Sequence, residues 1–520
     1  MMKKRLFLTG LCTVSLICLT TGCASENISK AGVETTAQTS TTDDGDTITD
    51  TDDTISNEPE ISNESMENNE DGGHVIETDG TTEEYSNLNI EKTGDSEGDE
   101  ADFYGENSAV FATNGATLTL SNLNVHTNGT HANGVFSYGE GTTVNISDST
   151  IETEGNCSGG IMTTGGGTMN AENLTIHTTG RSSAAIRSDR GGGAVNVTGG
   201  SYSTDGTGSP AIYSTADITV SDAELSSTAS EGIVVEGKNS VTLNNITLTA
   251  DNNQLNSDKS NTYKAVMIYQ SMSGDAAEGK ASFTMNGGSL TNENGDVFFV
   301  NNTVADVRLN GAVITNNGDG AFLRAEAAGW GNEGSNGGHV NMYANDQELN
   351  GDIVVDDIST LNLYLSGNSS LNGAINTAGA KGSVYVELKD ASSWTLTGDS
   401  YIGSLSCEGG SIHLNGYKLY VDGKEYTEDS SSTGQAYEIK VQTSDSDRQA
   451  PPDGEKPEGM GDGNTPPEPP EGMENPPEKP SGDMDGSAPP DFEKGTPPEK
   501  PSGDQGNPPD KPVEKTTDTN

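Results

Sequence analysis

Apolar residues recur along the middle of the chain in a pattern that combines two spacings. In the stretch TTVNISDSTI, residues 142–151, Val144 and Ile146 are two positions apart, and Ile151 follows after five more. A spacing of two is typical of a β-strand with one buried face. A gap of five fits neither a strand nor a helix, and turn-forming serine and aspartate lie within it. The stretch therefore predicts a strand, a sharp turn and a second strand.

The same unit, with apolar residues at positions n, n+2 and n+7, occurs eight times in succession. The first residues of these units are Leu118, Val144, Met169, Val195, Ile218, Val241, Phe283 and Val307. The steps between them are 23 to 26 residues, except for one step of 42. Each unit also carries a second apolar group about nine residues upstream, for example Val135-Phe136. Such regularity indicates a repeat architecture.

This periodicity predicts an all-β fold, namely a right-handed parallel β-helix. Equivalent strands of successive coils would pair in parallel, about 4.8 Å apart. Their inward side chains would stack in apolar ladders, because no single coil can bury its own apolar face. We assign residues 76–425 to this domain and expect loops at 251–264 and 271–280, which account for the long step. A third excursion is expected after Ala321, followed by terminal coils with an altered pattern.

The first 22 residues, 1–22, have the organisation of a lipoprotein signal peptide. Lys3, Lys4 and Arg5 precede an apolar run that is too short for a permanent transmembrane helix. The run ends in LTTGC at residues 19–23, which resembles a bacterial lipobox. The resemblance implies that Cys23 carries a lipid and that the mature chain is anchored on the extracellular face of the cell membrane.

Composition sets two flanking segments apart from the repeats. Residues 23–75 are acidic and rich in serine and threonine without an apolar period, which predicts a disordered linker. Residues 426–520 include a part rich in Pro, Gly and Glu that holds 18 of the 20 prolines, which predicts an extended, disordered tail. The whole chain has a formal net charge of −54. Such a charge disfavours nucleic acids and anionic membrane surfaces as partners.

Cysteine usage gives no sign of a disulfide scaffold. Beyond the predicted signal peptide and Cys23, only Cys157 and Cys407 remain, and they are 250 residues apart. We therefore expect both to be small buried side chains rather than the two halves of a bridge.

Several stretches of residues 80–425 resemble known β-helix proteins. The segments SSAAIRSDRGGGAVNVTGGSY at 182–202 and GSPAIYSTADITVSDAEL at 208–225 are similar to exported, pectate-lyase-like β-helix proteins of anaerobic Gram-positive bacteria. The segment SSWTLTGDS at 392–400 resembles the terminal coils of autotransporter passengers. The resemblance implies the fold and an extracellular location, and it implies no particular activity.

Three of the seven arginines of the chain lie within ten residues, between two glycine-rich turns. They are Arg181, Arg187 and Arg190, and Asp189 lies among them. Guanidinium groups bind carboxylates in a bidentate manner, so the cluster is a candidate binding site for an anionic sugar. The alternative is a charged turn whose residues form salt bridges with one another.

Two histidines and a glutamate occupy the position after n+7 in three successive coils. His126, Glu152 and His177 should therefore face solvent in one column, about one strand spacing apart. This column is a candidate transition-metal site, or else a set of charge pairs.

Trp330 and Tyr343 flank a glycine-rich loop and are candidates for stacking on a sugar ring. The alternative is that these aromatic residues fill or cap a coil.

No catalytic constellation emerges from the sequence. The Gly-His-Gly and Arg-Ile-Lys motifs of polygalacturonase-like enzymes do not occur, nor does the calcium nonapeptide of repeat toxins. No cofactor is predicted, although the many carboxylates should attract Ca²⁺ diffusely.

We expect a lipid-anchored surface protein that acts in adhesion or carbohydrate binding, with extracellular glycans or host or cell-wall surfaces as partners. The alternatives are a polysaccharide lyase or glycoside hydrolase, and a purely structural spacer.

Overall fold

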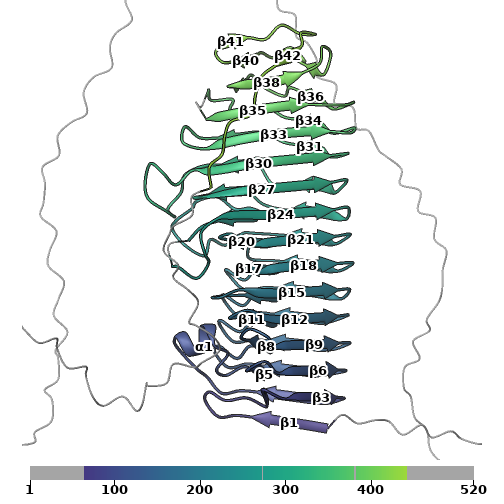
Figure 1. Cartoon of the computed structure of the whole chain (residues 1–520), viewed down its shortest axis with the longest axis vertical. Helices are drawn as coiled ribbons and strands as arrows, with labels where there is room; N and C mark the ends of the chain where they lie inside the picture. Colours follow the sequence, from purple (N-terminus) through teal and green to yellow (C-terminus); the bar gives the residue numbers. More distant parts are fainter. Residues whose placement is uncertain (1–63, 272, 380–381, 442–520) are drawn as a thin grey trace, which may run out of the picture. The chain divides into compact units, whose positions relative to one another are not determined.

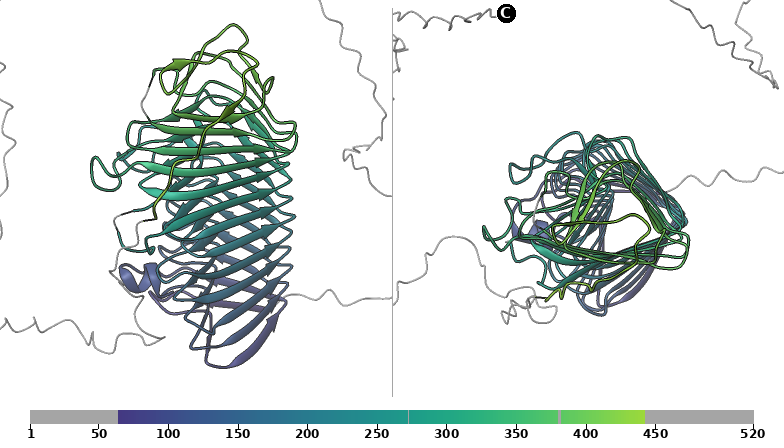
Figure 2. Two further views of the ribbon diagram at one scale, coloured as in Figure 1. Left: turned by 45° about the horizontal axis from the view of Figure 1, so that its top comes forward. Right: turned by 90° about the horizontal axis from the view of Figure 1, so that it is seen from above.

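The chain forms a right-handed parallel β-helix and passes through three β-sheets in each coil, as predicted. The computed structural model describes residues 64–271, 273–379 and 382–441. Successive coils superimpose when they are viewed along the stack, and each coil adds one strand to each sheet (Figure 1, Figure 2). The predicted signal peptide, Cys23, most of the predicted linker and the Pro-rich part of the tail lie outside the described residues.

The three long sheets, A, B and C, have 10, 11 and 14 strands, and sheet C continues into the last coils, whereas sheets A and B end before them. Sheet A contains β1 (Glu64–Asn68), β4 (Leu88–Lys92), β7 (Asn124–Thr127), β10 (Thr150–Thr153), β13 (Thr175–Thr178), β16 (Ser201–Thr204), β19 (Glu224–Ser227), β22 (Thr247–Ala250), β25 (Ser289–Asn292) and β28 (Val313–Asn316). Sheet B contains β2 (Ile76–Asp79), β5 (Val110–Thr113), β8 (Val135–Tyr138), β11 (Ile161–Thr164), β14 (Ile186–Ser188), β17 (Ile212–Ser214), β20 (Ile233–Glu236), β23 (Lys264–Tyr269), β26 (Asp296–Asn301), β29 (Leu323–Ala325) and β32 (Ile353–Val355). Sheet C contains β3 (Thr82–Ser86), β6 (Thr117–Ser121), β9 (Thr143–Ser147), β12 (Gly167–Glu172), β15 (Gly193–Thr198), β18 (Asp217–Ser221), β21 (Ser240–Asn244), β24 (Lys280–Asn286), β27 (Thr303–Asn310), β30 (Gly338–Asn345), β33 (Thr360–Ser366), β35 (Ser383–Leu388), β38 (Ser404–Cys407) and β42 (Ser432–Thr433).

The apolar ladders predicted from the spacing form the core. Positions n and n+2 lie on a strand of sheet C, and position n+7 lies on the following strand of sheet A. Ile151, for example, is aligned with Val125 in the coil before it and with Ile176 in the coil after it. All three side chains are almost fully buried. Burial of one such side chain stabilises a protein by about 1.5–3 kcal/mol, and the ladder repeats this contribution in every coil.

The sharp bend between sheets C and A depends on asparagine and aspartate. Two of the bends use a glycine pair, Gly199-Gly200 or Gly287-Gly288, and in many others one asparagine or aspartate has a positive φ, as in Asn122, Asp148, Asn173, Asp222 and Asn245. These two residue types accept the left-handed conformation more readily than other non-glycine residues, because their short polar side chains bond locally. The turn residues between n+2 and n+7 therefore define this corner of the coil, as the sequence predicts.

The turn between sheets A and B depends instead on a column of glycines. Gly94, Gly129, Gly155, Gly180 and Gly206 occupy equivalent positions in successive coils. A Cβ atom on each of the last four would lie 1.8 to 1.9 Å from the carbonyl oxygen of the glycine one coil earlier. Serine and threonine hydroxyls complete the turn, since Ser158 Oγ donates to Gly129 O at 2.9 Å and Thr153 Oγ1 donates to Ser158 O at 2.6 Å. These bonds repeat in the next coils and fix the backbone on either side of the glycines.

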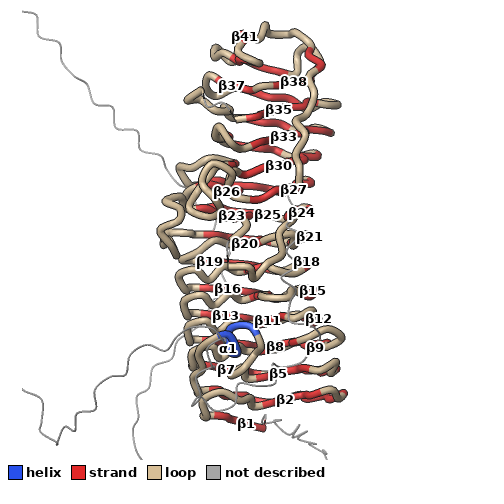
Figure 3. The backbone as a smooth tube through the Cα atoms, turned by 60° about the vertical axis from the view of Figure 1, so that its left-hand side comes forward, coloured by secondary structure: helices blue, strands red, loops and turns tan. Residues whose placement is uncertain are grey.

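Four excursions depart from the regular coil. The helix α1 (Asp99–Phe103), which the periodicity does not predict, lies in an insertion of the A–B turn (Figure 3). The described residues of the segments 251–263 and 270–279 contain no strand, which confirms the two loops predicted within the long step, and the segment 326–337 forms the third predicted loop. All four insertions connect to strands of sheet B.

The last coils use two further sheets, and the chain then turns back along the stack. Sheet D contains β31 (Glu348–Asn350), β34 (Ser370–Asn372), β36 (Ser393–Thr395) and β39 (Ile412–His413), and sheet E contains β37 (Ser400–Ile402), β40 (Leu419–Val421) and β41 (Lys424–Glu425). We call residues 432–441 the return segment. It crosses the outside of sheet C, where Tyr437 and Asn362 exchange two hydrogen bonds of 2.9 Å. The described β-structure thus starts before residue 76 and continues past residue 425. Among the residues described, no helix has the length and apolar character needed to cross a membrane.

Replacement of Gly155 by alanine should destabilise the stack without touching the apolar core. The new Cβ would lie 1.8 Å from Gly129 O, and we expect a loss of about 3 kcal/mol in the free energy of unfolding. Chemical denaturation followed by circular dichroism measures this loss. Gly287→Asn is the control, because its Cβ meets no atom within 4 Å and asparagine tolerates its φ of 62°. Equal stability of G155A and the wild type would show that the turns are not closely stacked.

Candidate functional site

The outer face of sheet B carries most of the unusual side chains of the molecule. Its outward column runs in register through Phe111, Phe136, Met162, Arg187, Tyr213, Val234, Met267, Phe299 and Arg324. Two apolar clusters on this face are covered by insertions. Tyr104, directly after α1, packs on the first cluster, and Trp330 of the loop 326–337 packs on the second. The charged pair of Arg187 and Asp189 lies between them.

Arg187 and Asp189 form an ion pair that is almost withdrawn from solvent. Arg187 Nη2 donates to Asp189 Oδ2 at 2.9 Å, and the two side chains are 12% and 6% exposed. Burial raises the pKa of Asp189 to about 6, against the opposing effect of the neighbouring Arg187 charge. Arg187 Nη1 is buried without a hydrogen-bond partner in the described part of the chain. Arg187 therefore has a buried hydrogen-bond donor that its pair with Asp189 does not use.

Arg190 joins three segments that are far apart in the sequence. Its guanidinium lies 3.6 Å from the centre of the Phe103 ring at the end of α1. It also forms ion pairs with Asp99 of α1 at 3.2 Å and with Asp275 of the loop 270–279 at 2.9 Å. Arg181, by contrast, is exposed in the A–B turn. Arg187 and Arg190, but not Arg181, are thus brought together with carboxylates as a polysaccharide lyase would require, and these carboxylates are engaged in ion pairs within the chain.

The column of His126, Glu152 and His177 has the predicted register in sheet A. The side chains nevertheless pair with other residues. His126 Nδ1 lies 2.8 Å from Glu91 Oε1, and His177 Nε2 lies 2.9 Å from Asp205 Oδ2. Charge pairing, the alternative weighed from the sequence, accounts for both histidines, and metal binding by this column stays a prediction.

The two aromatic residues proposed to stack on sugars are engaged in packing. The Trp330 ring contacts Tyr269 edge to face, with 5.4 Å between ring centroids. Tyr343 has the ring of Tyr364 stacked at 4.9 Å, and the guanidinium of Arg308 lies 4.8 Å from its centroid. Sugar binding by Trp330 stays a prediction, and its ring already helps to cover the outer face of sheet B.

A cluster of Asp102, His131 and Cys157 lies beside Arg187, and the sequence interpretation missed it. His131 Nε2 is 2.9 Å from Asp102 Oδ1, while His131 Nδ1 bonds to the carbonyl oxygen of Ser96 at 2.7 Å. One ligand atom from each of the three residues lies within 4.8 Å of the other two. His131 is buried, and the other two are partly exposed. The expectation of a buried cysteine side chain is correct for Cys407 and wrong for Cys157, which is only partly buried.

The electrostatics of this cluster favour charged groups. Hydrogen bonds with Asp102 and with Cys157 raise the pKa of His131 to about 10. The hydrogen bond with His131, and then the positive charges of His131 and Arg187, lower the pKa of the Cys157 thiol against the effect of burial. The same histidine lowers the pKa of Asp102. These shifts stabilise the thiolate of Cys157 and the carboxylate of Asp102 relative to the same groups free in solution.

The sequence contains a signal for two of these three residues. His131 and Cys157 both stand at position n+13 of their units, counted from Leu118 and Val144. Alignment of whole coils, and not only of their apolar positions, places the two side chains in adjacent A–B turns. No such signal exists for Asp102, because it lies in an insertion with no counterpart in the other coils.

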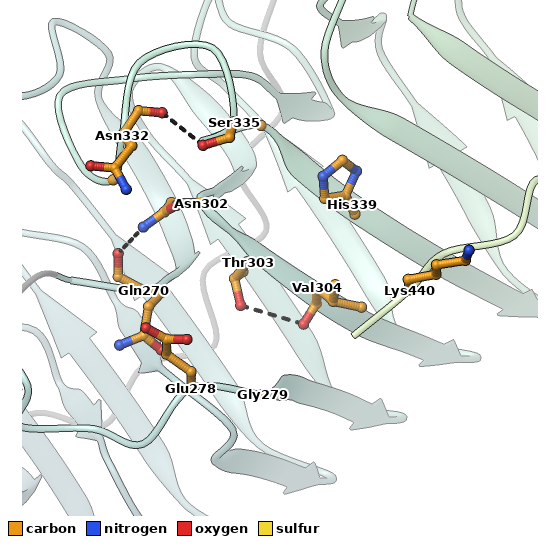
Figure 4. A pocket seen from close by; sticks show the side chains of 12 residues that line it. Gln270, Glu278, Gly279, Asn302, Thr303, Val304, Asn332, Ser335, His339 and Lys440 are labelled. Atoms are coloured by element: carbon orange, nitrogen blue, oxygen red, sulfur yellow. Dashed lines mark hydrogen bonds between the residues drawn. The ribbon is translucent and has the colours of Figure 1, made fainter. Parts of the chain in front are cut away.

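A polar cleft of about 170 Å³ lies farther along the stack, beside the loop 326–337 (Figure 4). Its walls come from the loops 270–279 and 326–337, from β27 and β30, and from the return segment. The lining side chains include Gln270, Glu278, Asn302, Asn332, Ser335, His339 and Lys440. Figure 4 shows these side chains on the different segments around the cleft. The cleft is thus lined mainly by groups that form hydrogen bonds.

Several of these lining groups have spare bonding capacity. Gln270 is 7% exposed, and its Oε1 has no hydrogen-bond partner in the part of the chain that the structure describes. Glu278, His339 and Lys440 form no ion pair with any described residue, although each lines the same cleft. Burial lowers the pKa of His339, so its ring is neutral at pH 7 and has one nitrogen donor and one acceptor.

Comparison of the chain with protein-family models, with curated proteins and with solved structures gives no match. The class of the protein, an all-β chain built as a parallel β-helix, is therefore defined by its own strand pairing. Its function has to be argued from the geometry of the outer faces.

Replacement of Arg190 by glutamine should loosen α1 from the outer face of sheet B. The variant loses two ion pairs and the contact with Phe103, for which we expect about 1–2 kcal/mol of local stability. Hydrogen exchange of the amides in residues 97–106 measures the change as faster exchange. Arg181→Gln is the matched control, because Arg181 is an exposed arginine in the same cluster. Unchanged exchange in R190Q would mean that other contacts hold the helix.

Proposed function

We propose that the chain is a lipid-anchored protein of the extracellular face of the cell membrane and that its β-helix binds extracellular glycans. The proposal places the binding site in the polar cleft beside the loop 326–337. The observation that supports it best is the set of polar side chains in this cleft that have no partner among the described residues, namely Glu278, His339 and Lys440. Uncommitted groups that converge on one cleft favour a polar ligand over a purely structural role.

The chemistry of the lining suits a sugar. Amides and hydroxyls supply both donors and acceptors, and a sugar presents hydroxyl groups that need both. The dimensions of the cleft suit one sugar residue at a time rather than a large ligand. The remaining residues of a glycan would then lie along the outer face of sheet C, where β30 continues from His339 to Asn341 and Tyr343.

The charge of the chain favours a neutral glycan over a polyanionic one. The formal net charge is −54, and long-range repulsion of this kind slows the approach of an anionic polymer. Within the cleft, one carboxylate, Glu278, is accompanied by one ammonium group, Lys440. The cleft therefore lacks the surplus of cations that recognition of uronate or sulfate chains requires.

Glycan-array binding by the full chain, with and without Ca²⁺, tests this proposal. We expect saturable binding of neutral glycans in both conditions. His339→Ala should weaken the binding at least tenfold, because loss of a buried hydrogen bond to a ligand costs about 1–3 kcal/mol. Lys440→Met should weaken it as well.

Lys389→Met provides the control for these variants, because Lys389 lies exposed and pairs only with Glu387 among the described residues. Binding that is equal in the wild type, H339A and K440M would place the site elsewhere. An array without any saturable glycan would favour the structural-spacer alternative. Release of unsaturated uronate products would instead support the lyase alternative.

A further inference from the structure

Two consecutive A–B turns hold His131 and Cys157 one above the other. His131 N donates to Asn156 O at 2.9 Å, which joins the histidine turn to the cysteine turn. Cys157 N in turn donates to Arg181 O of the next coil at 2.8 Å. Both residues have a left-handed φ, 56° and 57°. Because these turns contain the stacked glycines, neither side chain can shift along the stack without breaking the turn.

The insertion that contains α1 supplies a third side chain to the same place. Asp102 lies on α1, and its carboxylate reaches His131 Nε2 at 2.9 Å. Arg190 holds this helix through Phe103 and Asp99, the neighbours of Asp102 along the helix. The contacts of Arg190 with the helix, which lie outside the cluster, therefore place the Asp102 carboxylate beside the two turns.

The second nitrogen of His131 determines what the cluster can bind. Nδ1 bonds to the carbonyl oxygen of Ser96 at 2.7 Å, and a carbonyl only accepts, so Nδ1 carries the hydrogen. A metal ion would replace the proton on Nε2, the nitrogen that faces Asp102 at 2.9 Å. Histidines that bind metals usually donate their other ring N–H to a carbonyl or carboxylate, which fixes the tautomer.

We propose that Asp102, His131 and Cys157 form a binding site for Zn²⁺ or a similar transition-metal cation. Zinc is bound tetrahedrally by thiolate, imidazole and carboxylate, with bonds of about 2.0–2.3 Å. Donor atoms that lie within 4.8 Å of one another surround a point at this distance after small adjustments. Three protein ligands leave one position for water or another ligand, and the partial exposure of Asp102 and Cys157 makes that position accessible.

A catalytic triad is the main alternative, and the geometry disfavours it. In a Cys-His-Asp triad the histidine bonds the acid through one ring nitrogen and the nucleophile through the other. Here Asp102 occupies Nε2 and the backbone of Ser96 occupies Nδ1, so no ring nitrogen is left for the thiol. An imidazole, a carboxylate and a thiol whose ligand atoms lie within 4.8 Å of one another are the arrangement of a shared cation. This proposal is independent of glycan binding, because the cleft lies beside other coils.

Titration of the full chain with Co²⁺ and then Zn²⁺ tests the site. We expect one tightly bound Co²⁺ with a thiolate-to-cobalt charge-transfer band and the intense visible bands of tetrahedral cobalt, all of which Zn²⁺ should remove. Cys157→Ser should abolish the charge-transfer band. His131→Ser and Asp102→Asn should each weaken binding at least tenfold.

The serine variants at positions 131 and 157 should fold, because serine already occupies the equivalent position in other coils. Ser182 occupies the equivalent position in the next coil with a φ of 56°, and Ser96 occupies it in the coil before His131. Cys407→Ser is the control for the charge-transfer band, because Cys407 is the other described cysteine and is buried. Circular dichroism of each variant verifies the β-helix.

Hydrogen exchange gives a readout that is independent of the spectrum. Zn²⁺ should slow the exchange of residues 97–106 in the wild type and leave it unchanged in C157S, because the metal would join α1 to the two turns. The proposal is wrong if cobalt gives no thiolate band, or if the band survives in C157S. It is equally wrong if Zn²⁺ leaves the alkylation of Cys157 by iodoacetamide unchanged, which would indicate a free nucleophilic thiol.

Discussion

Close stacking of equivalent backbone positions is the constraint on which this fold depends. In the A–B turns the carbonyl oxygen of one glycine occupies the place where the Cβ atom of the next coil would lie, at 1.8 to 1.9 Å. Glycine is required there for lack of space and not for its conformation, since Gly129, Gly155 and Gly180 have no positive φ. Hydroxyl groups of serine and threonine then satisfy the turn carbonyls that strand pairing cannot reach. Burial of the apolar ladders stabilises the stack, whereas the turns determine the register in which successive coils pair.

This register also explains why outward residues acquire defined neighbours. An outward side chain in one coil lies above and below the corresponding side chains of the adjacent coils, as His131 and Cys157 do. A regular coil therefore offers columns of similar residues, such as the hydrogen-bonded asparagines Asn145, Asn170 and Asn196 on sheet C. Insertions bring in residues that the columns lack. The helix α1 brings Asp102 to one turn, and the loop 326–337 brings Asn332 and Ser335 to the cleft.

The sequence predicts the structural features that recur in every coil, but it does not predict contacts that occur only once. The spacing of Val144, Ile146 and Ile151 predicts the strands, the sharp bend and the ladder partners, because each follows from a local period. The partner of His126 follows from the period, because Glu91 stands in register with it one coil earlier. The partner of His177 does not, because Asp205 lies two positions beyond the residue aligned with His177 in the next coil. The contact of Arg190 with Phe103, Asp99 and Asp275 joins residues up to 91 positions apart through two insertions. Its geometry depends on how each insertion folds back, which no repeat encodes.

The two candidate sites lie where insertions meet the regular coils. All four insertions border sheet B, and each meets a face whose outward column departs from the apolar pattern at Arg187 or Arg324. A charged residue buried under an insertion has to be paired, because an isolated buried charge is costly. Asp189 pairs with Arg187 and Asp296 pairs with Arg324. The insertions also bring in polar groups outside these pairs, Asp102 beside His131 in one case and Asn332 at the cleft in the other. In this solenoid the charged residues of the outer column are therefore paired within the chain, while its apolar residues pack in the clusters that the insertions cover.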